Sequence, residues 1–354
     1  MKKNHITLAH GAGGEVMQGL IKDLILNQFD FGNFGSDIEI PLSSLDDSSV
    51  VSDIVFTIDS HTVKPLFFPG GDIGSLSVSG TVNDISVMGA DPIALSSAFI
   101  IEEGFLVEDL ERILKSMKKC CEKAEVPIIT GDTKVVEGGG IEGMLVTTSA
   151  IGLRSELLED NIREVERYRE FGERWIRDSN LRRGDMVIVS GTVGDHGVSL
   201  LSFREGYGFE SEVESDVAPL NKMIAEALKV GGVTVMKDPT RGGLSNTLNE
   251  ISEKSGVGIM IEEENVPLRK PVISACEMLG LDPLEIGNEG KVVMGVIKEK
   301  ADEVLEVVKA TEEGRDARII GVATGDVNGV VMKTRVGGKR IIETPVGDPV
   351  PRIC

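Results

Sequence analysis

Residues 72–86, Asp-Ile-Gly-Ser-Leu-Ser-Val-Ser-Gly-Thr-Val-Asn-Asp-Ile-Ser, form the stretch that says most about the fold. Asp72 can cap a helix that starts at Ile73, and the many Gly and Ser residues indicate that this helix packs closely against its neighbours. The end of the stretch returns in the second half as Thr-Leu-Asn-Glu-Ile-Ser at 247–252, and Asp238 precedes its Asn by eleven residues, as Asp72 precedes Asn83. The repeat predicts two halves with related local structure, and chance similarity is the alternative.

Strands and helices alternate on both sides of the helix predicted for 73–89. In 107–124 the apolar residues recur every three or four positions, which predicts an amphipathic helix with Cys121 on its core face. The glycine-rich segment from His10 to Gly14 precedes a predicted helix at 15–28. Predicted strands of the first half are 54–58, which exits at Asp59, 93–101, 126–129, which exits into Gly131-Asp132-Thr133-Lys134, and 144–151.

The second half repeats this alternation after a segment of different character. Residues 154–183 are densely charged with a thin apolar stripe, which predicts a solvated linker helix. Predicted strands follow at 186–189, 233–236, 259–261 and 292–297, and predicted helices after Gly194-Asp195-His196-Gly197, at 217–228, after Asp238-Pro-Thr-Arg-Gly-Gly, at 271–279 with Cys276 on an apolar face, and at 301–309. We therefore expect domains at 1–153 and 184–343, the linker at 154–183 and a tail at 344–354.

The composition limits the class of protein. A chain of 354 residues exceeds one ordinary core and suggests two domains. A net charge of −21 argues against a nucleic acid or an anionic membrane as partner, because either would need a basic surface. The four cysteines lack metal-ligand spacing, and the chain starts without the apolar run of a signal peptide. These features predict a soluble, cytoplasmic protein.

The last residues, Pro-Val-Gly-Asp-Pro-Val-Pro-Arg-Ile-Cys from 345 to 354, predict an extended arm that ends in a thiol. Three prolines exclude a helix and favour a semi-rigid chain that can carry Cys354 into a cleft. A frayed terminus with an incidental cysteine is the alternative. Prenylation is excluded, because it needs the cysteine four residues from the end.

Carboxylates gather at predicted strand exits and helix starts of the first half: Asp46, Asp47, Asp59, Asp72, Asp84 and Asp132. Each alone is a cap or turn residue by default. Several in one pocket would repel one another unless cations offset their charge, and Mg²⁺ with a polyphosphate is the usual combination. The chain has no Walker A motif, no dinucleotide-type glycine motif and no kinase signatures. The residues thus predict a metal–nucleotide site of an unusual kind.

An ordered set of motifs sharpens this prediction. The set comprises His10-Gly-Ala-Gly-Gly, Phe67-Phe-Pro-Gly-Gly-Asp-Ile-Gly, Gly80-Thr-Val-Asn-Asp, Gly131-Asp-Thr-Lys, Gly194-Asp-His-Gly, Asp238-Pro-Thr-Arg-Gly-Gly-Leu, Asn288-Glu-Gly-Lys and Pro351-Arg-Ile-Cys. It spans nearly the whole chain and resembles the HypE family of hydrogenase maturation proteins, within the ATP-binding superfamily of aminoimidazole ribonucleotide synthetase and selenophosphate synthetase. The charged linker is longer than the family pattern leads us to expect.

The resemblance implies a two-domain α/β (α+β) fold, a homodimer formed through the N-terminal halves, and ATP with Mg²⁺ in a cleft between domains. It implies ATP-dependent dehydration of an S-carbamoyl group on the terminal cysteine to a thiocyanate, which supplies a cyanide ligand of [NiFe]-hydrogenase. The implied partners are the carbamoyltransferase HypF and the scaffold proteins HypC and HypD. The implied site residues are, for catalysis, Cys354, Lys134 and Glu289; for ATP, His10, Gly13, Asp72, Asn83, Thr133, His196, Asp238 and Arg241; and for metal, Asp47, Asp59, Asp84 and Asp132.

Two other functions stay open on the sequence. Another enzyme of the superfamily, such as selenophosphate synthetase or a thiamine-phosphate kinase, would share the fold. Selenophosphate synthetase would want a reactive Cys near the start of the chain, whereas the first one here is Cys120. A nucleotide-gated adaptor that presents its tail to partners without turnover is the non-enzymatic alternative.

Overall fold

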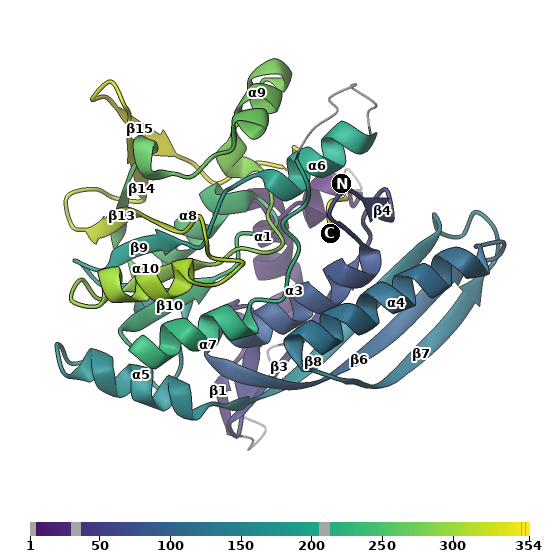
Figure 1. Cartoon of the computed structure of the whole chain (residues 1–354), viewed down its shortest axis with the longest axis horizontal. Coiled ribbons are helices and arrows are strands. Elements are labelled where there is room, and N and C mark those ends of the chain that lie inside the picture. Colours follow the sequence, from purple (N-terminus) through teal and green to yellow (C-terminus); the bar gives the residue numbers. More distant parts are fainter. Residues whose placement is uncertain (1–4, 30–36, 205–212, 348, 351) are drawn as a thin grey trace.

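The computed structural model describes residues 5–29, 37–204, 213–347, 349–350 and 352–354. Within these residues the strands form two large sheets, one in each half of the chain (Figure 1). The N-terminal sheet has the strand order β1-β2-β3-β8-β6-β7. Its strands are β1 (Ile38–Ile40), β2 (Ser49–Val51), β3 (Ile54–His61), β6 (Ala90–Glu102), β7 (Ile128–Val136) and β8 (Met144–Arg154).

Helices α3 (Ile73–Val87) and α4 (Val107–Ala124) cover one face of this sheet. Asp72 caps α3 as predicted, since its Oδ1 accepts hydrogen bonds from the backbone N–H groups of Gly74 at 2.8 Å and Ser75 at 2.9 Å. Nearly every residue of α3 is buried, because α3 also contacts helix α7 and strand β10 of the second half. The glycine- and serine-rich helix is therefore the packing centre between the two sheets.

The C-terminal sheet is buried on both faces. Its strand order is β10-β12-β9-β13-β11-β14-β15, and its strands are β9 (Met186–Val189), β10 (Val233–Lys237), β11 (Gly258–Glu262), β12 (Val293–Val296), β13 (Arg318–Thr324), β14 (Val330–Lys333) and β15 (Lys339–Ile342). In β9, Ile188 joins the core cluster shared with the N-terminal half, while its neighbours Val187 and Val189 join a second cluster on the other face. Helices pack on both faces, which explains the continuous apolar runs.

The helices of the second half are α5 (Glu156–Glu166), α6 (Asp195–Arg204), α7 (Asn221–Val230), α8 (Gly243–Ser255), α9 (Lys270–Leu279) and α10 (Ala301–Lys309). α5 and α10 pack against α7, and α10 also contacts β9 and β13, whereas α8 contacts β11 and β14. Short elements complete the chain: β4 (Phe67–Phe68), β5 (Gly71–Asp72), and the 3-10 turns Leu8–Gly11, Leu42–Ser44, Asp178–Asn180, Glu263–Asn265 and Pro283–Glu285.

The segment predicted as a solvated linker helix is only partly helical and is packed. α5 ends at Glu166, and the following residues run irregularly to β9. The apolar stripe Leu158, Ile162 and Val165 is buried against the core, and the Asn161 side chain bonds both backbone groups of Val233. The prediction of a solvated helix was wrong, because the dense charges lie on the outer face of this segment and do not describe its buried face.

The chain ends are also packed rather than free. The N-terminal helical segment comprises α1 (Glu15–Leu20), a π-helical turn (Ile21–Ile25) and α2 (Leu26–Gln28). The Glu15 N–H donates to the Pro345 carbonyl at 3.2 Å, and a Cβ on Gly14 would lie 1.9 Å from the same oxygen. Val350 and Ile353 are fully buried. The predicted flexible arm is thus a docked segment in this structure, while Asp348 and Pro351 lie outside the described residues.

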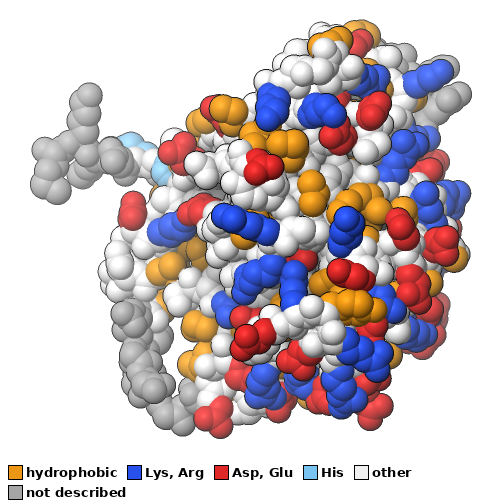
Figure 2. Space-filling model, turned by 90° about the vertical axis from the view of Figure 1, so that its left-hand side faces the viewer, with side chains coloured by type: hydrophobic (Ala, Val, Ile, Leu, Met, Phe, Trp, Pro, Cys, Tyr) orange, Lys and Arg blue, Asp and Glu red, His pale blue; other side chains and the backbone are white. Residues whose placement is uncertain are grey.

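Several predicted ends of strands and helices differ from those in the structure by a few residues. Asp59 lies inside β3 instead of at its exit, Gly131 to Lys134 lie inside β7, and the helix predicted from 217 begins at Asn221. Among the described residues, no helix is long and apolar enough to span a bilayer. On the face drawn in Figure 2, Lys and Arg side chains are interspersed with Asp and Glu, and no single-sign area dominates.

Candidate functional site

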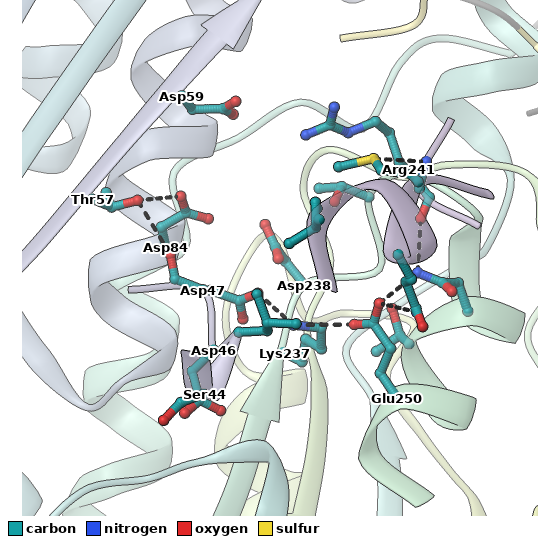
Figure 3. A pocket seen from close by; sticks show the side chains of 18 of the residues that line it. Ser44, Asp46, Asp47, Thr57, Asp59, Asp84, Lys237, Asp238, Arg241 and Glu250 are labelled. Atoms are coloured by element: carbon teal, nitrogen blue, oxygen red, sulfur yellow. Dashed lines mark hydrogen bonds and ion pairs between the residues drawn. The ribbon is translucent and has the colours of Figure 1, made fainter. Parts of the chain in front are cut away.

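A cavity of about 540 Å³ opens between the two halves of the chain. Its walls come from β3 and α3 on one side, from β10 and α8 on the other, and from the N-terminal segment and the terminal residue. Figure 3 shows Asp47, Asp59 and Asp84 facing Lys237, Asp238 and Arg241 across this space. The size suits a ligand of several hundred daltons.

The N-terminal wall holds the carboxylates of Asp59 and Asp84 in fixed positions. Alternate residues of β3 point toward α3, so Thr57 and Asp59 face that helix. The Thr57 hydroxyl donates to Asp84 on α3 at 2.8 Å, and Asp59 lies 3.2 Å from the buried His61 imidazole. Gly80 allows this approach, because a Cβ there would already lie 3.2 Å from His61.

The C-terminal wall supplies cations and further acids, among them Asp238 and Glu289. Asp238 and Arg241 follow β10, and Glu289 precedes β12. A Cβ on Gly13 would lie 2.6 Å from the Arg241 side chain, which explains a glycine in the N-terminal segment at this point. Glu289 is buried, and its Oε1 has no hydrogen-bond partner among the described residues.

A buried ion-pair network joins the halves beside the cavity. The Lys237 ammonium contacts Asp47 at 2.5 Å, Asp178 at 3.2 Å and Glu250 at 3.4 Å. Lys254 contacts Asp178 at 2.6 Å. The sequence analysis missed Lys237, although a lysine that ends an otherwise apolar strand directly before the Asp238 motif was an available signal.

The carboxylates of the cavity disfavour one another's ionised forms. Burial and the nearby Asp238, Asp59 and Asp47 raise the pKa of Asp84 well above its usual range. Burial and Asp47 raise the pKa of Asp238 to about 8. Burial also raises the pKa of Asp47, to about 6 even though Lys237 opposes the shift. At Asp59, burial is outweighed by His61 and Arg241, and the pKa is lowered.

This charge pattern fits a cation that arrives with its own ligands. Among the described residues, no three His, Cys, Asp or Glu side chains are arranged to hold a metal ion by themselves. Asp47, Asp59 and Asp84 nevertheless share one cavity, and the raised pKa values of Asp47 and Asp84 show that these two lack enough nearby positive charge to ionise freely. A divalent ion that brings phosphate oxygens would complete its own shell and relieve this repulsion.

The terminal residue lies in the same cavity. Cys354 lines it, and the Thr62 hydroxyl donates to the Cys354 main-chain oxygen at 3.2 Å. The charge of Cys354 is the main cause that raises the pKa of the Arg241 guanidinium. Burial raises the pKa of Cys276 and of Cys121 to about 11, and it also raises the pKa of Cys120. Of the four cysteines, all of which the structure describes, Cys354 is the one that lines the cavity.

Three predicted residues lie elsewhere within one chain. Asp132, Thr133 and Lys134 are exposed on the edge strand β7, and Lys134 contacts Asp132 at 2.9 Å. Asp132 pairs with Ala98, Ala98 with Thr147 and Thr147 with Ser60 across the sheet. Paired residues share a face, so Asp132 and Lys134 point away from α3 and from the cavity of their own chain.

Four predicted ATP contacts have other partners in the structure. Asp72 caps α3, and His10 bonds Thr7 at 2.9 Å. The Asn83 side chain holds the Ala218 carbonyl and the Leu220 N–H, which positions the segment before α7. His196 is buried between Ser215 and Ile353, so it contacts the tail instead of lining the cavity. Gly13, Asp238 and Arg241 remain as cavity residues.

The chain is similar to known proteins over most of its length. The family model of the AIR synthase related protein, N-terminal domain, matches residues 45–154, and that of the C-terminal domain matches residues 182–333. The carbamoyl dehydratase HypE of Rhizobium leguminosarum bv. viciae is 44% identical over 357 residues, which cover 99% of this chain and 95% of the relative. The carbamoyl dehydratase HypE of Azotobacter vinelandii is 41% identical over 361 residues, with 100% and 98% covered.

Solved structures agree with these relatives. The HypE–HypF complex contains a chain that superposes with a TM-score of 0.82 and 43% identity, covering 92% of this chain and 99% of that one. HypE in complex with ATP superposes with a TM-score of 0.78 and 39% identity, covering 99% and 100%. The two-domain fold expected from the sequence is confirmed.

Proposed function

Because the chain belongs to the HypE family of carbamoyl dehydratases, enzymes of hydrogenase maturation that act by ATP-dependent dehydration, we propose that it dehydrates a carbamoyl group carried on the thiol of its own Cys354. The observation that supports this most is the position of Cys354, which lines one cavity with Glu289, Arg241 and the aspartates. The selenophosphate synthetase alternative is not supported, because the relatives that match the full length are carbamoyl dehydratases.

The chemistry sets what the cavity must do. The carbamoyl oxygen attacks the γ-phosphorus of ATP, the bond from that phosphorus to the bridging oxygen breaks, and ADP leaves as the nitrogen gives up one proton. Loss of the second nitrogen proton and cleavage of the carbon–oxygen bond then release phosphate and leave S–C≡N. Phosphate can leave where oxide cannot, so ATP is a stoichiometric co-substrate.

Glu289 is our candidate base for the nitrogen protons. It is buried in the cavity wall with one carboxyl oxygen unpaired among the described residues, so that oxygen is available to a substrate N–H. Burial and Asp238 raise the pKa of Glu289 well above its usual range, and the positive charge of Arg241 opposes this shift. Arg241, which faces Cys354, can stabilise the charge of the transferring phosphoryl group.

Asp47, Asp59 and Asp84 would hold Mg²⁺ together with the phosphates of ATP. The bound ion would neutralise phosphate charge and draw these side chains into one arrangement. In the structure Asp47 is paired with Lys237, and Asp84 accepts a hydrogen bond from Thr57. Lys237 and Arg241 give the acidic chain a local positive wall for the nucleotide.

A second copy of the chain would complete the site. The sheet face opposite α3 exposes apolar side chains, among them Phe56 at 45% and Ile58 at 63%, which supports a homodimer formed face to face through these sheets. Asp132 and Lys134 border this face, and Thr133 lies between them on β7. We infer that they act in the cavity of the partner, Asp132 toward the metal and Lys134 toward phosphate.

The other partners follow from the reaction. The HypE–HypF structure supports HypF as the protein that loads the carbamoyl group, and HypC and HypD are the proposed acceptors of the cyano group. The four cysteines are not joined in disulfides in the described part of the chain. A terminal thiol that must be carbamoylated has to stay reduced, so we place the reaction in the cytoplasm.

Intact-mass spectrometry tests the proposal. Incubation with HypF and carbamoyl phosphate should add one carbamoyl group to the C-terminal peptide, and ATP with Mg²⁺ should then remove the mass of one water molecule. Cys354→Ser should take up neither change while binding ATP normally, because only one sulfur atom is replaced. A cyano group found on another cysteine of this variant would overturn the assignment.

A further inference from the structure

A short segment, Ser215–Asp216, lies behind the cavity, contacts Glu289 directly and reaches the docked tail through His196. The segment precedes α7 and carries no motif of the sequence analysis. Its backbone is fixed by close contacts, since the Ser215 N–H donates to the Pro69 carbonyl at 2.8 Å and a Cβ on Gly70 would lie 2.7 Å from Ser215. Such an approach leaves the segment little freedom.

On one side, Asp216 holds the backbone of Glu289. Asp216 Oδ1 accepts from the Glu289 N–H at 3.0 Å, and Oδ2 pairs with the Lys291 ammonium at 3.1 Å. Both side chains of this pair are over nine-tenths buried. A Cβ on Gly290 would lie 1.7 Å from the Asp216 carbonyl oxygen, so the Glu289 turn is packed directly onto the segment.

On the other side, Ser215 reaches the tail through His196. The His196 Nε2 lies 2.8 Å from the Ile353 carbonyl, and Nδ1 lies 2.8 Å from the Ser215 hydroxyl. A carbonyl only accepts, so Nε2 carries the proton. Burial lowers the pKa of His196, so the ring is neutral and Nδ1 accepts from Ser215, whose oxygen in turn accepts from the Val217 N–H at 3.2 Å.

We propose that Asp216 is a positioning residue for the dehydration step, which holds Glu289 toward the cavity and, through Ser215 and His196, ties it to the tail that carries Cys354. This inference rests on the proposed role of Glu289. Two reacting groups, the base and the thiol-borne carbamoyl, are then fixed to one rigid segment. Misplacement of such groups by about 1 Å typically costs on the order of 100-fold in rate.

Two matched double variants isolate the hydrogen bond to Glu289. Asp216→Asn/Lys291→Met and Asp216→Ala/Lys291→Met both remove the buried ion pair, but only the first keeps an acceptor for the Glu289 N–H. Single-turnover dehydration of carbamoylated protein should be roughly 10- to 100-fold slower in the Ala variant than in the Asn variant. The KM for ATP should differ less than twofold between them, and so should the fraction folded by near-UV circular dichroism.

Equal dehydration rates in the two variants would overturn the inference. Glu289→Gln separates this outcome from failure of the proposed function. If Glu289→Gln still dehydrates the carbamoyl group, Glu289 is not the base. If Glu289→Gln is inactive and the two double variants react equally fast, only the positioning role of Asp216 is excluded. Ser215→Ala tests the tail link, and carboxamidomethylation of the C-terminal peptide by iodoacetamide should become several-fold faster. An unchanged labelling rate would exclude the connection through His196.

Discussion

Lys237 forms ion pairs with carboxylates from both halves of the chain. It is buried and contacts carboxylates from the N-terminal half, from the segment after α5 and from α8. The buried acids raise its pKa well above the ordinary lysine value, against the effect of burial. A buried charge with several partners stabilises the fold only while all partners are present.

Lys237→Met should therefore destabilise the protein by about 3–5 kcal/mol, because it leaves Asp47 and Asp178 without their shared cation. Urea unfolding at neutral pH measures this change. Lys222→Met is the matched control, since Lys222 pairs with Glu125 on the surface, where solvent screens the charges and a pair contributes little to stability. Equal losses in both variants would show that the network contributes no more than a surface pair.

Asp238 makes the free energy of unfolding depend on pH, and this dependence can be measured without ATP. Its pKa of about 8 lies above the unfolded value of about 3.9, so the folded protein holds a proton there that the unfolded chain releases. The free energy of unfolding contributed by Asp238 therefore falls as pH rises from about 4 to about 8.

Asp238→Asn should remove this decline. The variant should gain stability relative to the parent protein between about pH 5 and about pH 8, measured by urea unfolding with EDTA present. Mg²⁺ with ATP should reduce the gain, because it offsets the same repulsion. A constant difference between the two proteins over that range would contradict the assignment.

The docked tail is the element whose behaviour most affects the reaction. Arg352 contacts Glu142 at 2.7 Å and the Thr62 carbonyl at 3.1 Å, and Ile353 packs against Gly287, where a Cβ would lie 2.4 Å from its side chain. In the proposed reaction the thiol must also meet HypF to be loaded. The tail therefore needs both a docked state for dehydration and an undocked state for loading.

Ile353→Ala should shift the tail toward the undocked state without unfolding the protein. Loss of the buried side chain costs about 2 kcal/mol or more, which corresponds to roughly 30-fold in the docking equilibrium. Labelling of Cys354 should become faster and dehydration slower, while loading by HypF is retained. Val346→Ala, at a tail position that is 70% exposed, should change neither rate. Slower labelling of Ile353→Ala would rule out this docking mode.

At the scale of the whole molecule, the proposed site takes its residues from two chains of a dimer. The cavity combines residues from both domains of one chain, but β7 directs Asp132 and Lys134 away from it. The exposed apolar face beside them has the character of an interface. Together these features predict two sites per dimer, each shared between subunits.

Mixing two inactive variants tests this sharing. Asp84→Asn and Asp132→Asn should each abolish ATP turnover, and the Asp84→Asn side chain can still accept from Thr57. After exchange of subunits, the mixture should recover about one quarter of the wild-type turnover, because half of the dimers are mixed and one of their two sites is intact.

Phe56→Glu in both chains should prevent that recovery by separating the dimer, as light scattering would show, whereas Val336→Glu on an exposed turn should not. Sites contained in one chain would give no recovery in any mixture.

Local signals in the sequence were sufficient for much of this protein. The cap at Asp72 and the amphipathic helix α4 follow from short spacings, because capping and helix periodicity act over a few residues. The cavity residues Asp84 and Arg241 were implied by the family resemblance. The ordered motifs were also enough to identify the family, since their order is a property of the chain alone.

Only the tertiary structure decided where distant residues meet. The burial of Ile353, the pairing of Lys237 with Asp47 and the outward direction of Asp132 each depend on contacts between segments far apart in the sequence. Proline content predicted that the tail is extended but not that it is docked, because a groove for it exists only after both domains have folded. Side-chain direction in β7 depends likewise on strand register, which pairing across the sheet sets.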